Sequence, residues 1–311
     1  LEEWFEHPLM VADLCTSGII GTFLGPRSPG SGYVLLHHYM GEVDGEFRAW
    51  GFAKGGTGAV SQAIAAAARA FGAEIRTEAP VEQVIVKNGQ ARGIALENGD
   101  EIYADIVVSA ADPKRTFLQL VDPALLPDVF VATIRKYNIH GSSAKVNLAL
   151  AGLPEFECLP GPGPHQRAAI SIGPSVDYIE RAYDDAKYGD FSRRPYLDLL
   201  IPSLIDPDMA PPGQHVMTCF VQYAPYRLKE GTWDEKREAL GDAVVDALAL
   251  FIPNIKKIIV GRQVMAPVDI ERVAGITGGN IFHGELRLSQ LLFSRPAPGY
   301  KQYRTPIQNY Y

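Results

Sequence analysis

Cysteine is scarce in this sequence, and its three copies lie far apart. Cys15, Cys158 and Cys219 form no Cys-x-x-Cys pair, so neither a redox dithiol nor a zinc knuckle is expected. The spacing favours free thiols in a reducing compartment. The seven histidines lack the His-x-x-x-His spacing of a helical zinc site, and we therefore expect no metal centre.

Long apolar runs and an excess of positive charge are also absent. No apolar run approaches the roughly 18 residues of a membrane-spanning helix, which leaves a peripheral membrane contact open. The net charge is −7 and no stripe of Lys and Arg is present, so nucleic acid is not an expected partner. The start of the chain does not resemble a signal peptide. We expect a cytoplasmic protein, with membrane association and homo-oligomerisation left open.

The overall composition is that of a folded protein. Of the 311 residues, 47% are hydrophobic and 21% are charged, which suits one large domain or two medium ones. The sequence begins at Leu1 rather than Met and ends at Tyr311, just after a strand-like pattern has begun. We interpret it as a piece of a longer protein.

A glycine-rich turn and an alanine-rich helix form the most informative segment, KGGTGAVSQAIAAAARAFGAEIRT at residues 54–77. Apolar residues recur there at helical spacing, at Val60, Ile64, Ala67 and Phe71. This predicts a helix over 59–71, and its many alanines would let it lie close against a sheet. The letters AEIRT that follow predict a short strand.

Strand patterns follow this helix. Runs at 81–87 and 91–97 flank Asn88-Gly89, and Asn-Gly is a strong signal for the turn of a hairpin. The apolar run 106–109 predicts a buried strand, and Ala-Ala-Asp-Pro at 110–113 predicts a tight exit from it.

Residues 116–275 predict a second unit, made of a sheet with flanking helices. Strand-like runs lie between clusters of proline, in the segments KVNLAL, YLDLLI and HVMTCFVQY. Thr232 and Glu235 have the spacing of a capping box, and an apolar face follows them up to Pro253. This predicts a helix between Thr232 and Pro253.

The glycine-rich turn is a weak match to a nucleotide-binding loop. Position 61 is Ser where the Gly-x-Gly-x-x-Gly fingerprint has its third glycine, and no strong strand precedes Lys54. The Gly-Lys-Ser/Thr end of a Walker loop is also missing. We expect instead a helix start at which the glycines allow close approach of the backbone.

The order of these pieces resembles an internal segment of the phytoene desaturase and amine oxidase superfamily of flavoproteins. The resemblance covers residues 55–113, 194–226 and 278–311. It is strongest to phytoene dehydrogenase-like proteins and to the branch named for a pyridine nucleotide-disulphide oxidoreductase domain. The superfamily's amino-terminal Gly-x-Gly-x-x-Gly unit and its carboxy-terminal glycine-rich segment are absent, which implies truncation at both ends.

The resemblance implies a mixed α/β (α+β) fold. It would comprise part of a Rossmann-like FAD-binding domain and a substrate domain with a mixed or antiparallel sheet and flanking helices. The implied boundaries are 1–53 for a substrate-domain or lid segment, 54–115 for the inner part of the FAD-binding domain, 116–275 for the substrate domain, and 276–311 for the return to the FAD-binding domain.

The resemblance also implies cofactor and substrate contacts. Val81 matches a position whose backbone contacts adenine, and residues 109–111 match a strand end that passes near FAD. The cofactor-binding candidates are thus Val81, Ser109, Ala110 and Ala111. The substrate-side candidates are Lys54, Gly55, Gly56 and Gly58. An ordinary strand valine, a tight turn and a solvated lysine are the alternatives.

The catalytic candidates lie near the end of the sequence. His283 and Arg295 fall in the segment that returns to the cofactor domain, where the alternative is a turn-capping histidine and a surface arginine. Further candidates for the wall of a pocket are His37, His38, Tyr39, Tyr223, Tyr226, Tyr300 and Tyr303. Core packing would explain the tyrosines equally well.

The function implied by the resemblance is that of an FAD-dependent oxidoreductase. It would be dehydrogenase- or desaturase-like and would transfer hydride from an apolar small molecule to flavin, with an unknown electron acceptor. The alternatives are a redox-neutral flavin-dependent isomerase and a non-catalytic interaction protein that keeps the fold. Because the pyrophosphate-binding unit is absent, we expect FAD in the intact protein rather than tightly held by these 311 residues.

Overall fold

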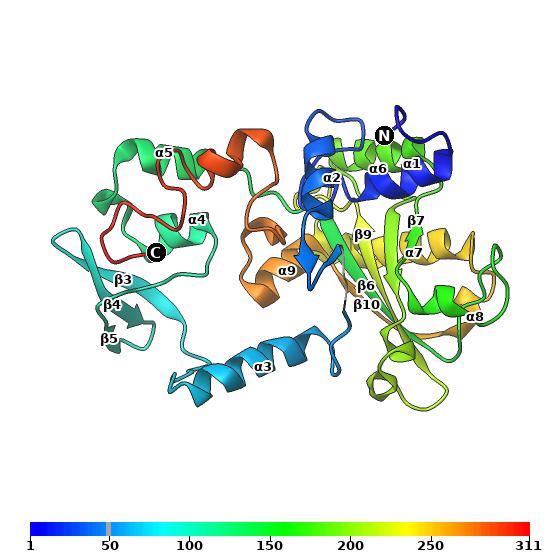
Figure 1. Cartoon of the computed structure of the whole chain (residues 1–311), viewed down its shortest axis with the longest axis horizontal. Helices are drawn as coiled ribbons and strands as arrows, with labels where there is room; N and C mark the ends of the chain where they lie inside the picture. Colours follow the sequence, from blue (N-terminus) through cyan, green and yellow to red (C-terminus); the bar gives the residue numbers. More distant parts are fainter. Residues whose placement is uncertain (48–50) are drawn as a thin grey trace.

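The structure, a computed structural model, describes residues 1–47 and 51–311. Figure 1 shows a larger body on the right, a smaller body on the left, and helix α3 (Thr57–Ala70) extending below the space between them. The larger body contains residues 1–47 and 143–274, and the smaller body contains 81–136 and 297–311. We call residues 137–142 and 275–296 the crossing segments, because they connect the two bodies.

The larger body is built on a five-stranded antiparallel sheet with the order β10-β6-β9-β8-β7. One face packs against helix α7 through a large apolar cluster that includes Val146, Leu148, Cys219, Leu240 and Val244. The predicted strands and the predicted antiparallel sheet are thereby confirmed. The bounds are β6 Ser143–Leu150, β7 Ile170–Ile172, β8 Tyr196–Leu200, β9 His215–Gln222, β10 Ile259–Met265, α7 Trp233–Ala249, α8 Ile255–Ile258 and α9 Pro267–Ala274.

The capping box at the start of α7 forms as predicted. The Glu235 backbone N–H donates to the Thr232 hydroxyl at 3.4 Å, and the Thr232 backbone N–H donates to the Glu235 carboxylate at 2.8 Å. Two backbone donors that the helix cannot satisfy internally thus find partners, which sets the residue at which the helix begins.

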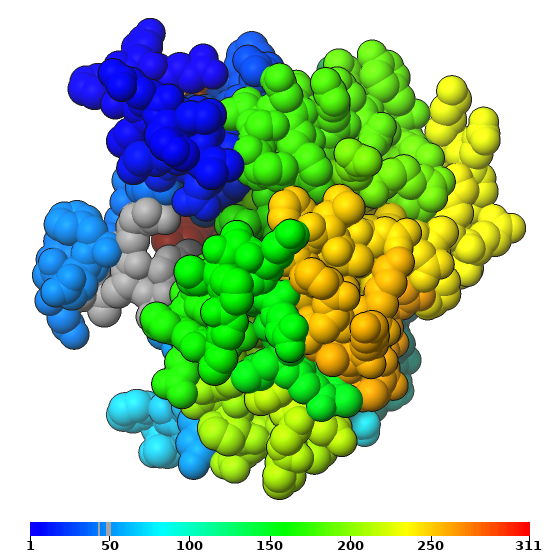
Figure 2. Space-filling model, turned by 90° about the vertical axis from the view of Figure 1, so that its right-hand side faces the viewer, coloured from blue at the N-terminus to red at the C-terminus, as the bar shows by residue number. Residues whose placement is uncertain are grey.

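The amino-terminal segment covers one end of the sheet. Side chains of α1, α6 and the sheet share an apolar cluster that includes Cys15, Ile19, Ile179 and Tyr223. Figure 2 shows this segment in blue, against green residues of the larger body. The bounds are α1 Pro8–Thr16, α2 Ser31–Tyr39, β1 Glu42–Val43, β2 Glu46–Phe47 and α6 Val176–Lys187.

The smaller body holds the predicted hairpin. Strands β3 and β4 pair across Asn88 and Gly89, whose φ angles of 53° and 73° are those that an Asn-Gly turn supplies. A second apolar cluster joins the hairpin to α5 and to the end of the chain through Val84, Phe117 and Tyr310. The bounds are β3 Val81–Lys87, β4 Gln90–Leu96, β5 Glu101–Tyr103, α4 Pro113–Arg115, a π-helical turn Thr116–Leu120 and α5 Asp128–Lys136.

Short 3-10 turns complete the two bodies and the crossing segments. They are η2 Pro123–Leu125, η3 Pro164–Arg167, η4 Pro202–Leu204, η5 Pro207–Met209, η6 Thr277–Gly279, η7 Leu288–Gln290 and η8 Leu292–Ser294. Within the described residues, no helix has the length and apolarity that crossing a membrane requires. The domain boundaries stay predictions.

Three expectations about burial and strands in residues 57–109 are wrong. Helix α3 forms, but none of its residues is buried, and its neighbour Phe71 is 92% exposed. Residues 73–77 are not a strand. In the run 106–109, Val108 is 73% exposed. The physical reason is shared: apolar periodicity marks a face that can be buried, and no described segment packs over these faces.

The crossing segments are joined by buried polar contacts. The fully buried Glu285 carboxylate lies 3.0 Å from His140 Nδ1 and 2.7 Å from Arg287 Nε. The Asn280 side-chain amide donates to the His140 carbonyl at 2.9 Å. A buried carboxylate is tolerated only with such partners, so these contacts hold the two crossing segments together.

Asp112 links the smaller body to a crossing segment. One carboxylate oxygen accepts from the backbone N–H groups of Lys114 and Arg115 at 3.0 and 3.1 Å. The other accepts from the Thr277 hydroxyl at 2.6 Å. The side chain is 2% exposed, so it caps α4 and also binds the crossing segment.

We expect Asp112→Ala to lower the free energy of unfolding by about 3 kcal/mol, because it removes a helix cap and a buried charge-assisted hydrogen bond. Asp122 is the matched control: it also precedes a proline and caps a short turn, but it is exposed. Asp122→Ala should cost about 1 kcal/mol or less. Urea unfolding measures both, and equal losses would contradict the linking role of Asp112.

Candidate functional site

A groove of about 420 Å³ lies beside the three-stranded sheet of the smaller body. All four residues predicted to bind the cofactor line it: Val81, Ser109, Ala110 and Ala111. Val81 begins β3, whereas the other three end the extended run after β5. The fold therefore brings together positions that lie 28 to 30 residues apart in the sequence.

Backbone pairing and two alanines form one wall of the groove. Residues 107–109 pair in parallel with 309–311, through Val107 N–H to the Asn309 carbonyl at 2.9 Å and Ser109 N–H to the Tyr311 carbonyl at 2.8 Å. Alanines at 110 and 111 then keep side chains out of the space. The exit turn is held by the Thr116 hydroxyl, which donates to the Ala111 carbonyl at 3.2 Å.

Tyr310 supplies a buried polar group on the groove wall. The residue is 1% exposed, and its hydroxyl makes no well-aligned hydrogen bond to the described residues, although the Ser109 and Thr116 hydroxyls lie close enough to act on its pKa. Burial raises the pKa of this phenol, while the neighbouring Ser109 and Thr116 hydroxyls act in the opposite direction. A buried hydroxyl whose hydrogen bonds are poorly aligned gains from a better partner. Such a group, on a wall of small residues, fits part of a flavin nucleotide.

The glycine-rich turn lies away from the groove, against the η5 turn of the larger body. Gly55 N–H donates to the Asp206 carboxylate at 2.6 Å, and Gly55 and Gly56 have φ angles of 82° and 77°. Lys54 Nζ lies 3.9 Å from the exposed Asp208 carboxylate, and such a pair contributes little. Gly58 has open space where a Cβ would lie. These four residues share a location, but none lines the groove.

His283 and Arg295 are brought close by the fold. The Arg295 guanidinium donates to the carbonyls of Phe282 at 2.6 Å and Gly284 at 3.4 Å, the two residues that flank His283. It also lies 6.0 Å from the centre of the buried Tyr137 ring. Arg295 thus holds the backbone on both sides of His283, whose φ is 55°. Their predicted catalytic role stays a prediction.

Of the histidine pair in α2, His38 reaches the same segment. Its ring packs edge-on against Phe282 at 5.7 Å. Burial lowers the pKa of His38, and its Nε2 is buried without a partner among the described residues. His37 is exposed, and Tyr39 is partly buried.

The four tyrosines named as pocket candidates do not form one wall. Tyr223 is buried and donates to the Leu24 carbonyl at 2.7 Å, and Tyr226 bonds to Glu271. Tyr300 packs on Phe130 in the smaller body, whereas Tyr303 is 87% exposed. Packing and hydrogen bonding within the fold account for the first three.

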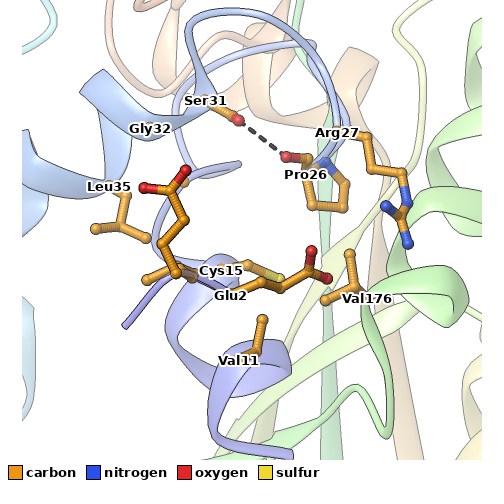
Figure 3. Close-up of a pocket in the computed structure, with 12 residues that line it drawn as sticks. Glu2, Val11, Cys15, Pro26, Arg27, Ser31, Gly32, Leu35 and Val176 are labelled. Carbon is orange, nitrogen blue, oxygen red and sulfur yellow. Dashed lines mark hydrogen bonds between the residues drawn. The ribbon is translucent and has the colours of Figure 1, made fainter. Parts of the chain in front are cut away.

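A second cavity, of about 550 Å³, lies between the chain start, α1 and α2 (Figure 3). Its lining includes Cys15, Arg27 and Glu2, but none of the predicted site residues. Burial raises the pKa of the Cys15 thiol to about 12, so this thiol stays protonated and unreactive. Among the described residues, no group of three or more His, Cys, Asp or Glu side chains could hold a metal ion.

Two acidic residues of functional interest are not among the residues predicted from the sequence. Asp112 stood in the Ala-Ala-Asp-Pro motif, where Asp before Pro is a signal for a helix cap. Asp198 lies in β8, on the face of the five-stranded sheet opposite α7, which we call the open face. Its signal was a single carboxylate within the apolar run YLDLLI. Burial, and then the nearby Asp13 charge, raise the pKa of Asp198 from 3.8 to about 6.

We expect Arg295→Ala to lower the free energy of unfolding by about 2 kcal/mol, because the Phe282 and Gly284 carbonyls lose a charged donor. The control is Arg304→Ala, which removes an exposed arginine nine residues further along the chain and should change stability by less than about 0.5 kcal/mol. Urea unfolding compares them. An equal, small effect of both would remove the assigned role of Arg295.

The Asp198 pKa predicts a pH-dependent stability difference. Between pH 3.8 and about 6 the unfolded carboxyl loses its proton while the folded one keeps it, so its contribution to stability falls as pH rises. Asp198→Asn lacks this decline. The free energy of unfolding of the variant, relative to that of the wild type, should therefore increase by about 2 kcal/mol between pH 4 and pH 7, after allowance for the partial exposure of Asp198. Unfolding measured across this range tests the sign, with exposed Asp128→Asn as control.

Comparisons with known proteins identify the family of this chain. A protein of Rattus norvegicus called pyridine nucleotide-disulfide oxidoreductase domain-containing protein 2 is 41% identical over 320 residues, covering 100% of this chain and 55% of the relative. Phytoene desaturase (lycopene-forming) of Pseudescherichia vulneris is 26% identical over 280 residues, covering 87% of this chain and 52% of the relative. The chain thus spans about half the length of the curated relatives it matches.

A solved structure supports the fold. The crystal structure of an oxidoreductase from Methanosarcina mazei superimposes with a TM-score of 0.59 at 17% identity, covering 97% of this chain and 58% of that one. The predicted mixed fold class is confirmed. Residues 16–264 match the family described as flavin containing amine oxidoreductase, which confirms the resemblance predicted from the sequence and agrees with FAD as the cofactor. The chain therefore belongs to the flavin-containing amine oxidoreductase family.

Proposed function

We propose that the parent protein is an FAD-dependent oxidoreductase that removes hydride from an organic substrate with an apolar reacting segment. The observation that carries the proposal is the groove, where Val81, Ser109, Ala110 and Ala111 meet beside the buried Tyr310 hydroxyl. The four positions that the sequence predicted to contact the cofactor thus line one apolar surface of the smaller body.

In this proposal the groove residues hold one end of the cofactor. Val81 offers backbone atoms at the start of β3, and Ala110 and Ala111 leave room for a flat ring close to the main chain. The Tyr310 hydroxyl, which makes no well-aligned hydrogen bond to the nearby Ser109 and Thr116 hydroxyls, would gain a further partner. When bound, FAD supplies the acceptor for the hydride, and the protein supplies position and electrostatics.

The larger body has the substrate-binding role in this proposal. Its sheet turns one face to α7. On the other face α1 and α6 pack over Tyr196 of β8, whereas Lys145 of β6 is exposed. Figure 1 shows the smaller body on the side away from α7 and α8. Asp112 and the crossing segments set the position of this face relative to the groove. The electron acceptor, a peripheral membrane contact and self-association stay predictions.

The proposal is tested by the flavin content of the purified full-length parent protein, from its visible absorption spectrum and mass spectrometry of what heat releases. Ala110→Leu fills the groove and should weaken flavin binding by roughly tenfold or more, as overpacking costs about 1–3 kcal/mol. The control Ala124→Leu places the same group at an exposed site and should leave the flavin content unchanged.

The outcomes also separate the two alternatives. A colourless parent protein would overturn the flavin enzyme and leave the interaction protein. A flavoprotein that converts substrate without an electron acceptor would be the redox-neutral isomerase. Retained flavin in Ala110→Leu would mean that the groove is not the cofactor site.

A further inference from the structure

A row of five side chains, one from each strand, crosses the open face of the sheet. Directly paired residues on neighbouring strands share a face, and the register gives the row Ser171, Asp198, Phe220, Lys145 and Met265. At the next level the opposite face carries Val146, Cys219 and Leu199, which belong to the core against α7. The row therefore points away from that core.

Asp198 enters this row without a compensating charge. The structure gives its side chain no hydrogen bond and no ion pair within residues 1–47 and 51–311. The charge that acts on its pKa, Asp13 of α1, has the same sign. A largely buried carboxylate without a cation lowers stability, and a group kept at such a cost is a candidate for binding a ligand.

Lys145 is the opposite charge in the same row. Its side chain is exposed, and no ion pair to a described residue is present. Between the two charges lies Phe220, which is half-buried and belongs to none of the three apolar clusters of the described chain. Because Asp198 and Lys145 are two strands apart, their Cα atoms are separated by about 10 Å.

The neighbouring row of the same face differs, because its polar groups bond to one another. The Thr218 hydroxyl donates to the Asn147 side-chain carbonyl at 2.9 Å, and the Asn147 amide donates to the Gln263 side-chain carbonyl at 3.0 Å. Polar side chains on this face can thus form hydrogen bonds with one another. The Asp198 and Lys145 side chains form no such hydrogen bond or ion pair with the described residues.

The row lies at the end of the sheet that adjoins the crossing segments. Lys145 is two residues from Ser143, where β6 begins, and Met265 ends β10. Just before β6, Gly141 N–H donates to the Gly278 carbonyl at 2.9 Å. Thr277, which precedes Gly278, bonds to Asp112 beside the groove. The row therefore lies at the end of the sheet that these hydrogen bonds connect to the groove.

We propose that this row binds a substrate that carries a cationic group at one end and an anionic group at the other, separated by an apolar segment. Asp198 binds the cation, Lys145 binds the anion, and Phe220 contacts the apolar middle. That the bound molecule is a substrate rests on the proposed function, whereas its binding to the row does not depend on that function. A plain hydrocarbon would leave both charges desolvated and unpaired, and a plain amine would leave Lys145 without a partner.

The test measures binding of 8-aminooctanoate, octylamine and octanoate to the 311-residue chain by isothermal titration calorimetry at pH 7.5. We expect 8-aminooctanoate to bind roughly tenfold more tightly than either singly charged compound. Asp198→Asn should abolish its advantage over octanoate, and Lys145→Gln its advantage over octylamine. The controls Asp128→Asn and Lys257→Gln change exposed residues elsewhere and should keep the wild-type preference.

Equal affinities for the three compounds, or a preference that survives both variants, would overturn the proposal. Lys145→Gln changes an exposed side chain, and Asp198→Asn removes a destabilising charge, so both should fold. Calorimetry needs no flavin, so its result is independent of the flavin content of the parent protein. A colourless parent protein that binds 8-aminooctanoate would remove the proposed function and keep the charged row.

Discussion

The buried Asp112 carboxylate is the interaction on which the arrangement of the two bodies depends. It caps helix α4, which follows the extended run 107–109 on the groove wall. It also accepts a hydrogen bond from Thr277 in a crossing segment. A carboxylate that is 2% exposed must have such partners. The end of the groove is therefore positioned by the same side chain that holds the crossing segment, which leads to the larger body.

Buried polar groups in this protein fall into two kinds. Glu285 has partners in His140 and Arg287 and joins the crossing segments. Asp198, in contrast, faces only a like charge, and the Tyr310 hydroxyl makes no well-aligned hydrogen bond to the described residues. The ion pairs of Glu285 stabilise the fold. Asp198 and Tyr310 lie on the open face and on the groove, where a ligand would supply a partner.

The sequence predicted the local elements well because their causes are local. The Asn88-Gly89 turn, the Thr232 capping box and the alanine-rich helix each depend on residues within a few positions. The same patterns failed for burial. The apolar faces of α3 and of residues 106–109 remain exposed, because burial depends on whether another segment covers a face, and periodicity carries no information on that.

For the site, the sequence by itself determined which residues are candidates for contact with the cofactor. It did so through the family resemblance and the Ala-Ala-Asp-Pro motif that ends at Pro113. Only the tertiary structure decided which of them meet. Val81 joins Ser109 in the groove, the Gly55 loop binds Asp206 instead, and Arg295 bonds to the backbone around His283. The shifted pKa of Asp198 likewise comes from burial and from Asp13, 185 positions away. Long-range contacts and desolvation exist only in the folded chain, which is why they could not be predicted from the sequence.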